Sequence, residues 1–269
     1  DTYSGEARFV SDHSIEVDEG GVCTILEADR ILIASGSRPE RPAHIPFDGR
    51  RVFDSDELLD LKHIPRSMIV VGGGVIGIEY GIMFATLGVH VTVVDGRERL
   101  LGFCDGEIVD ALLYHARSIG MVFRLGEDVV RTSLLGEDRV AIELESGKRL
   151  VAESVLMSVG RKGDVEGLNL EAAGLSTVGR GRLEINEHQQ TAVPHIYAVG
   201  DVVGFPALAS TAMEQGRRAV AHAFQQEEYA LSMMPYGLFT IPEISMYGAS
   251  EEELTKKCVP YEVGVARFR

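Results

Sequence analysis

Residues 68–79 read MIVVGGGVIGIE, in which four apolar residues lead directly into spaced glycines. An apolar run that ends at glycine is typical of a buried parallel strand, and the small and apolar residues that follow predict a helix. In the spacing Gly72-x-Gly74-x-x-Gly77, the first glycine permits a tight turn and the second permits close approach of a pyrophosphate. The third permits close packing of helix and strand. The segment therefore predicts the strand–turn–helix of a doubly wound, dinucleotide-binding α/β sheet.

The segments after this turn alternate between strand and helix patterns. They are a β-branched strand over 89–95, a helix over 107–119, a strand over 121–125, an alternating ribbon over 140–150 and a strand over 154–159. The last strand ends at Gly160. This order predicts one complete doubly wound domain over residues 66–162.

An acidic residue and two arginines follow the second predicted strand. Asp95 lies 18 residues after Gly77, where we expect a carboxylate to accept hydrogen bonds from the adenosine ribose of NAD. A solvated carboxylate at a strand end is the alternative. Arg97 and then Arg99 carry guanidinium groups of the kind that pairs with the 2′-phosphate of NADP. We expect Gly96 to give this loop room to move aside, so that one site accepts both nicotinamide dinucleotides.

Glu79 lies two residues after Gly77, on the first turns of the predicted helix. A carboxylate there either reaches the amide of a nicotinamide or simply interacts favourably with the helix dipole. Both alternatives remain open at this point.

A further polar cluster lies in IYAVGDVVGFPALAS, residues 196–210. An apolar strand ends there at Gly200-Asp201, and a helix is predicted from about Ala207. An aspartate at the carboxyl end of a strand, facing a helix N-terminus, has the geometry that holds a polyol or a phosphate. A solvated loop carboxylate is the alternative.

The chain also contains an internal repeat. ADRILIASGSR over 28–38 matches AESVLMSVGRK over 152–162, which makes Gly36 and Gly160 equivalent. A ribbon-like alternating stretch precedes each copy. The repeat predicts that residues 1–40 are the closing ribbon and last strand of an earlier nucleotide-binding domain, whose glycine turn would precede residue 1. We therefore expect an interior segment of a longer protein.

Charge and cysteine usage exclude several classes of function. The formal net charge of -15 argues against broad binding to nucleic acid or anionic membranes, because an acidic surface repels both. No apolar run approaches the ~20 residues of a membrane span. The three cysteines, Cys23, Cys104 and Cys258, form no C-x-x-C and no Cys/His pattern, so we expect neither a disulfide nor a metal site. Reduced thiols in a cytoplasmic protein are the expectation.

Several motifs together carry a family resemblance. They are ASGSRP, VVGGGVIGIE, SVGR, IYAVGDV, LASTAMEQGRRA and FTIPEISMYG. The chain resembles the pyridine nucleotide-disulfide oxidoreductase family of flavoproteins. This resemblance implies an FAD domain interrupted by an NAD(P) domain and followed by a dimerisation domain, in a homodimer or higher homo-oligomer. The implied segments are FAD domain over 1–65, NAD(P) domain over 66–162, FAD domain again over 163–232, and the start of the interface domain over 233–269.

The resemblance also implies roles for single residues. Ser35, Gly36 and Asp201 carry over as FAD contacts. The backbone at Ala209 would face the flavin, where a helix N-terminus stabilises charge on the reduced ring. The implied contacts of the nicotinamide dinucleotide are Gly72, Gly74, Gly77, Glu79, Asp95 and Gly160. No catalytic side chain is implied, because FAD itself relays the hydride.

Three functions remain in competition. RVFDSDELLDL, GFPALAS and PYEVGVARFR resemble the Si-specific transhydrogenase branch, which moves hydride from NADPH through FAD to NAD⁺. A dihydrolipoamide dehydrogenase-like disulfide reductase is the alternative, and it needs a cysteine pair that these three cysteines cannot provide. SVGRKGD lacks the Pro-Asn common after this Gly-Arg in disulfide reductases, which favours the first function. The third is a dinucleotide-binding module without turnover, and we expect the 269-residue chain itself to be inactive.

Overall fold

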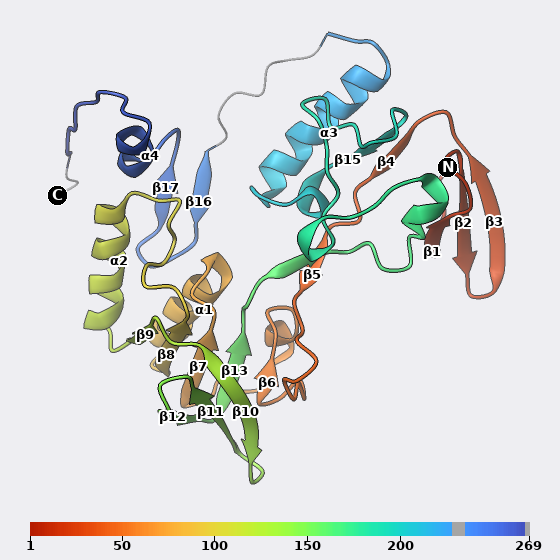
Figure 1. The fold of residues 1–269 in the computed structure, drawn as a ribbon. Coiled ribbons are helices and arrows are strands. Elements are labelled where there is room, and N and C mark those ends of the chain that lie inside the picture. Colours follow the sequence, from red (N-terminus) through yellow and green to blue (C-terminus); the bar gives the residue numbers. More distant parts are fainter. Residues whose placement is uncertain (228–234, 267–269) are drawn as a thin grey trace. The chain divides into compact units, whose positions relative to one another are not determined.

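The computed structural model describes residues 1–227 and 235–266, which form two compact units (Figure 1). We call Pro39–Gly160 with Met233–Arg269 the central unit, and Asp1–Arg38 with Arg161–Ser232 the split unit. Each unit is described by itself below.

The central unit is built on a five-stranded sheet of order β6-β13-β7-β8-β9, and the labels follow this order in Figure 1. Every pairing in it is parallel. The strands are β6 (Val52–Phe53), β7 (Ser67–Val71), β8 (His90–Asp95), β9 (Val122–Leu125) and β13 (Ser154–Met157). The chain runs outward from β7 to β8 and β9 and then returns to β13 on the other side of β7. The carboxyl ends of β7 and β13 therefore flank a topological switch point, where such sheets bind their ligands.

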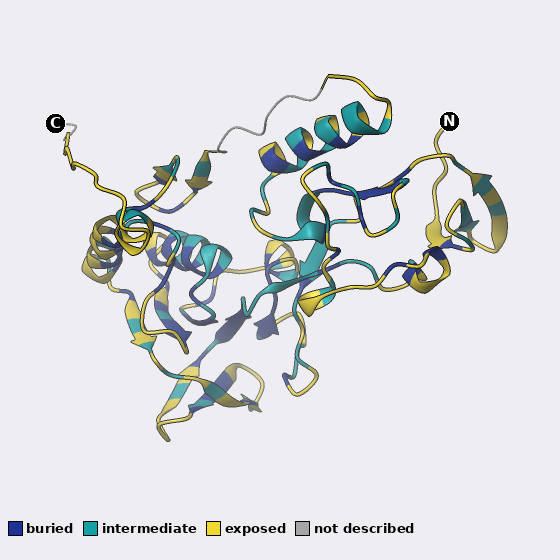
Figure 2. Cartoon of the chain, turned by 45° about the horizontal axis from the view of Figure 1, so that its top comes forward, coloured by how far each residue is buried: buried dark blue, intermediate teal, exposed yellow. Residues whose placement is uncertain are grey.

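Both faces of this sheet are covered. Met68 and Val70 of β7 pack in one apolar cluster with Ile78 of α1, while Ile69 and Val71 pack in a second cluster with the ribbon described below. Burial on both faces explains the unbroken apolar run of the sequence. Figure 2 shows β7 and β13 largely in the dark blue of buried residues. The helices of this unit are α1 (Val75–Thr86), α2 (Gly106–Ser118), η1 (Glu57–Asp60) and α4 (Glu251–Lys256).

The ribbon of the central unit has three antiparallel strands. They are β10 (Val129–Leu135), β11 (Arg139–Leu144) and β12 (Arg149–Ala152). The sequence predicts β11 and β12 from the alternation of Val140, Ile142 and Leu144, all of which are buried. It gives no expectation for β10, because only Thr132 of that strand is buried and its apolar residues do not mark one face.

The split unit contains short sheets and a long helix. Its strands are β1 (Glu6–Phe9), β2 (Ser14–Glu19) and β3 (Val22–Glu27) in an antiparallel sheet, β4 (Ile31–Ile33) parallel to β15 (Ile196–Ala198), and β5 (Ser37–Pro39) paired with β14 (Arg161–Gly163). Its helices are α3 (Ala209–Ala223), η2 (Leu170–Ala173), η3 (Gly179–Gly181) and η4 (Gly200–Val203). Apolar residues of β4, β15 and η2 pack together in one core of this unit.

The internal repeat has a structural counterpart. β4 ends at Ile33, shortly before Gly36, and β13 ends at Met157, shortly before Gly160. Both glycines have positive φ, 76° and 132°. The two strands lie in separate sheets, as the repeat predicts.

The compact units differ from the expected segments at residues 39–65, which belong to the central unit. The reason is β6, whose Val52 and Phe53 are fully buried and pair with β13. Motifs around the glycines do not reveal this pairing, because β6 has only two residues.

The expected boundary at 232/233 lies outside the described residues. Beyond it, β16 (Tyr236–Leu238) and β17 (Ile244–Met246) pair and pack Leu238 and Ile244 into the core of the central unit. Across the described residues, no helix is both long and apolar enough to traverse a lipid bilayer.

Candidate functional site

The glycine turn follows β7 at the switch point of the central sheet. Gly72 has a φ of 99°, and a Cβ on it would clash with the carbonyl of Ser158. A Cβ on Gly77 would clash with the carbonyl of Gly72 and lie 2.6 Å from the Ser158 hydroxyl oxygen. The packing of the protein itself therefore requires glycine at both positions.

Gly74 is different. Its φ of -74° suits any residue, and no heavy atom lies within 4 Å of a Cβ built on it. It is the N-cap of α1, and no side chain caps this helix end. The open space beside uncapped N–H groups fits the pyrophosphate of a dinucleotide, which needs close backbone approach there. The tight turn at Gly72 and the close packing at Gly77 are as expected, and the pyrophosphate contact at Gly74 stays a prediction.

Ser158 holds this turn from the neighbouring strand end. Its hydroxyl lies 3.0 Å from the Val71 oxygen and 2.7 Å from the Gly72 oxygen, and its N–H donates to Val71 at 2.8 Å. Sequence reasoning missed Ser158, although it is the second residue before Gly160 in the SVGR motif. Gly160 itself accepts a hydrogen bond from the Glu40 N–H.

Asp95, at the end of β8, is 7% exposed and accepts four hydrogen bonds. They come from the Gly73 N–H at 2.6 Å and from Arg97, through its N–H at 2.8 Å, Nε at 2.8 Å and Nη2 at 2.6 Å. Burial alone would raise the pKa of the Asp95 carboxyl, but these hydrogen bonds outweigh it and lower that pKa. The hydrogen bond to Asp95 also raises the pKa of Arg97. The predicted ribose contact and the predicted phosphate contact are therefore partners of each other.

Arg99 lies elsewhere, at the start of α2. A Cβ on Gly106 would lie 2.6 Å from Arg99 Nη2 and 2.6 Å from Glu252 Oε1, so both groups meet above that glycine. Glu252 also accepts the Gly106 N–H at 2.8 Å. Arg99 is thus placed with the α4 carboxylate rather than with Asp95.

Glu79 has a partner that sequence reasoning did not foresee. Its Oε1 accepts the N–H of Phe239 at 2.7 Å, in the segment after β16. Burial raises the pKa of the Glu79 carboxyl, and this hydrogen bond offsets part of the effect. Burial and the nearby Glu79 charge also raise the pKa of Tyr236.

In the split unit, three side chains form a chain of hydrogen bonds. The Ser37 hydroxyl donates to Asp201 Oδ2 at 2.8 Å, and Arg161 donates to Ser37 twice, from Nε to Oγ at 2.7 Å and from Nη2 to the carbonyl at 2.6 Å. Sequence reasoning proposed Asp201 but missed Ser37 and Arg161. A signal existed, because the internal repeat aligns these two residues immediately after Gly36 and Gly160.

The remaining predicted FAD contacts follow β4 or begin α3. Ser35 is exposed, and the carbonyl of Gly36 accepts the Asp164 N–H at 3.0 Å. Ala209 is the first residue of α3, slightly later than the sequence predicts, and no side chain caps that helix end. Gln215 of α3 accepts the Gly200 N–H at 2.7 Å, which fixes the turn before Asp201.

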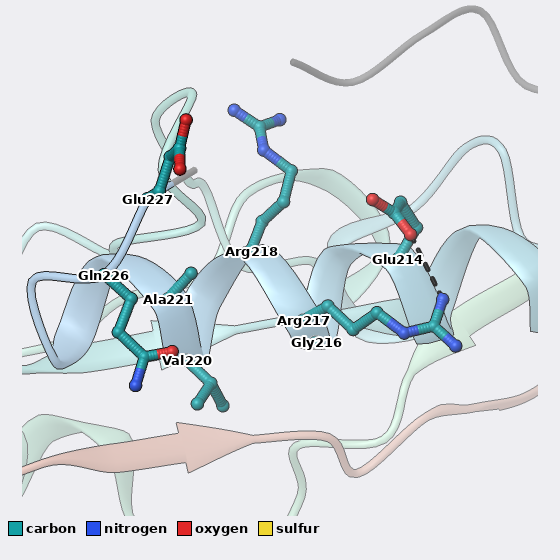
Figure 3. A pocket seen from close by; sticks show the side chains of 8 residues that line it. All are labelled: Glu214, Gly216, Arg217, Arg218, Val220, Ala221, Gln226 and Glu227. Atoms are coloured by element: carbon teal, nitrogen blue, oxygen red, sulfur yellow. Dashed lines mark hydrogen bonds and ion pairs between the residues drawn. The ribbon is translucent and has the colours of Figure 1, made fainter. Parts of the chain in front are cut away.

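A hollow of about 690 Å³ runs along α3 (Figure 3). It is lined by Glu214, Gly216, Arg217, Arg218, Val220, Ala221, Gln226 and Glu227. Arg217 and Glu214 form an ion pair at 3.2 Å on its wall. None of the predicted FAD contacts lines this hollow.

One group in the described ranges has the composition of a metal site: Asp12, His13 and His195, with possible ligand atoms within 4.8 Å of one another. The two imidazoles are stacked, with centroids 3.9 Å apart and planes at 3°. Parallel rings direct their nitrogen lone pairs along parallel planes and not toward one point. This arrangement therefore lacks the convergence that a metal centre requires.

A protein-family model described as pyridine nucleotide-disulphide oxidoreductase matches residues 2–216. Similar curated proteins include the soluble pyridine nucleotide transhydrogenases of Mycobacterium bovis BCG, 50% identical over 272 residues, and Azotobacter vinelandii, 45% identical over 271 residues. The alignments cover 100% of this chain and 58% of each relative. The chain thus spans a little over half the length of these proteins.

Solved structures of similar fold include two proteins at 28% identity. The HOCl-induced flavoprotein disulfide reductase RclA of Escherichia coli gives a TM-score of 0.85 over 95% of this chain and 59% of that chain. LpdA of Mycobacterium tuberculosis gives a TM-score of 0.87 over 94% and 56%.

Proposed function

The chain belongs to the pyridine nucleotide-disulphide oxidoreductase family, and from this membership we propose that it is part of a flavin-dependent Si-specific transhydrogenase that moves hydride between NADPH and NAD⁺. The names of its relatives at 45–50% identity support this reading. FAD, when bound, supplies the two-electron relay between the two nicotinamides, so no catalytic side chain is needed.

The glycine turn is the observation that carries the proposal. Gly72 and Gly77 are required by the protein's own packing, whereas Gly74 borders empty space at an uncapped helix end. We assign Gly72, Gly74 and Gly77 to the pyrophosphate of NAD(H) or NADP(H), with Gly160 and Ser158 supporting the turn.

The other proposed contacts divide between the two units. Asp95 and Arg97 would serve the adenosine ribose and its 2′-phosphate, and Glu79 would serve the nicotinamide amide after releasing Phe239. In the split unit, Asp201 would bind FAD, supported by Ser37. Ser35, Gly36 and Ala209 complete the proposed FAD contacts.

The segments 1–65, 66–162, 163–232 and 233–269 remain our proposal for FAD, NAD(P), FAD and interface functions. The compact units add that 39–65 packs with the NAD(P) part. We further propose a homodimer or higher homo-oligomer, as the family resemblance implies. We place this protein in the cytoplasm, because its three cysteines are free, as is usual in a reducing compartment.

A disulfide reductase is the second candidate, and the solved neighbour titled as a flavoprotein disulfide reductase favours it. The experiment compares a longer protein containing this chain with the 269-residue chain. Reduction of thio-NAD⁺ by NADPH in the longer protein supports the transhydrogenase, and lipoamide-dependent NADH formation supports the reductase. We expect the 269-residue chain to bind dinucleotide without turnover.

A further inference from the structure

The carboxylate of Asp95 has hydrogen-bond donors within its own loop. Two of its four hydrogen bonds come from the guanidinium of Arg97, at 2.8 and 2.6 Å. The hydroxyls of an unphosphorylated ribose would need acceptor positions on the same carboxylate. Arg97 and such a ribose would therefore compete for the same carboxylate oxygens.

We propose that Arg97 determines cofactor specificity as an internal competitor at Asp95, which NAD(H) must displace and which the 2′-phosphate of NADP(H) recruits. This inference rests on the proposed function, because it assumes that the central unit binds nicotinamide dinucleotides. It predicts that Arg97 weakens the binding of NAD(H) while it strengthens the binding of NADP(H), whereas a simple phosphate contact would affect NADP(H) alone.

The backbone of this loop is hydrogen-bonded on both sides of Gly96, which favours an exchange by the Arg97 side chain over the expected movement of the loop at Gly96. The Asp95 carbonyl accepts the Glu127 N–H at 3.2 Å, and the Arg97 carbonyl accepts the Gly126 N–H at 3.1 Å. A Cβ on Gly96 would clash with the carboxylate of Asp128. Since both flanking residues are anchored to the β9–β10 connection, the exchange must occur by rotation of the Arg97 side chain.

The two partners differ in their freedom to move. The Asp95 side chain is 6% exposed and keeps the N–H groups of Gly73 and Arg97 whatever the guanidinium does. The Arg97 side chain is 57% exposed, so its guanidinium can turn toward solvent. A ribose that displaces the guanidinium leaves it in solvent and supplies hydroxyl donors to Asp95 in its place.

With a phosphorylated ribose, the Arg97 guanidinium favours binding instead of opposing it. Asp95, and Asp128 beside Gly96, are carboxylates that would repel a phosphate near this loop. A guanidinium released from Asp95 would offset that charge with charge-assisted hydrogen bonds. Arg99 does not replace it, because its guanidinium lies beside Glu252 at α2.

The test is titration of NADH and NADPH into the 269-residue chain, followed by calorimetry. Arg97→Met should weaken NADPH binding about ten- to a hundredfold. The same change should tighten NADH binding about two- to fivefold, because the competitor is gone. Arg99→Met is the matched control and should leave both dissociation constants unchanged.

A second variant isolates the competition. In an Asp95→Asn background, where the carboxylate charge is absent, Arg97→Met should no longer tighten NADH binding. If wild type binds both cofactors and Arg97→Met leaves NADH binding unchanged or weaker, Arg97 does not compete with NAD(H) at Asp95. The proposed function stands in that case. If wild type binds neither cofactor, the proposed function fails and this inference fails with it.

Discussion

In both units a parallel strand ends shortly before a glycine, but the two units differ in how many strands pair in that sheet. Each has a parallel strand that ends shortly before a glycine of positive φ, Gly160 in the central unit and Gly36 in the split unit. The central unit sets five parallel strands beside one another, whereas among the described residues the corresponding sheet of the split unit consists of β4 and β15.

The difference shows in the strands that end before the two glycines. Leu32 of β4 is 43% exposed, whereas every residue of β13 is buried. The comparison teaches that the same strand-to-glycine ending occurs in a five-stranded parallel sheet and beside a single paired strand.

The largest expected effect is the difference in affinity of the 269-residue chain for NADPH and for FAD. The central unit has a complete glycine turn and should bind NADPH, while the split unit should hold FAD weakly or not at all. Calorimetry with each cofactor should give dissociation constants at least about a hundredfold apart, or ~2.7 kcal/mol. Stoichiometric flavin absorbance in the purified 269-residue chain would contradict this.

Two alanine substitutions in the glycine turn separate packing from binding. Gly77→Ala should destabilise the chain by about 1–3 kcal/mol, because its Cβ would clash with the Gly72 carbonyl. Gly74→Ala should leave stability nearly unchanged, because its Cβ meets no atom, yet it should weaken NADPH binding. Urea unfolding and calorimetry measure the two effects. Equal destabilisation by both changes would argue that the space at Gly74 is not open.

A substitution in the split unit tests its hydrogen-bonded chain. Arg161→Met removes two charge-assisted hydrogen bonds to Ser37 and should cost about 1.5–3 kcal/mol. The neighbouring Lys162→Met removes only a surface ion pair with Glu166 and should cost below about 1 kcal/mol. Thermal unfolding of both variants is the measurement. Similar losses would mean that Arg161 does not hold Ser37 and Asp201.

The smallest effect concerns pH in the central unit. Folding raises the pKa of Glu79, so the folded state binds this proton more tightly and loses stability as pH rises past the unfolded pKa. Glu79→Gln keeps an acceptor for Phe239 and should raise stability at pH 7 by less than about 1 kcal/mol. Melting curves should show this gain shrinking toward pH 4. A gain that is the same at both pH values would exclude ionisation as its cause.

Local spacing predicts the parts of the fold and site that depend on neighbours in the chain. The strand before Gly72, the helix after Gly74 and the carboxylate at the end of β8 are all found where the sequence places them. Each follows from apolar periodicity and glycine spacing within about thirty residues, the length of one strand–helix–strand unit.

Contacts between distant segments were not predictable in the same way. Ser158 reaches the glycine turn across a strand pair, and Arg161 reaches Ser37 across 124 residues. The guanidinium of Arg97 is close in sequence to Asp95, but spacing alone does not reveal which partner a flexible side chain takes before a ligand arrives.

The short strand β6 has a practical consequence for how this protein can be divided. A piece that began at residue 66 would keep the glycine turn but would remove Val52 and Phe53 from the edge of β13. The bare strand would then offer unpaired backbone groups to other molecules, which favours edge-to-edge aggregation. A separately expressed piece built on this sheet should therefore begin near Pro39, well before the glycine turn at Gly72.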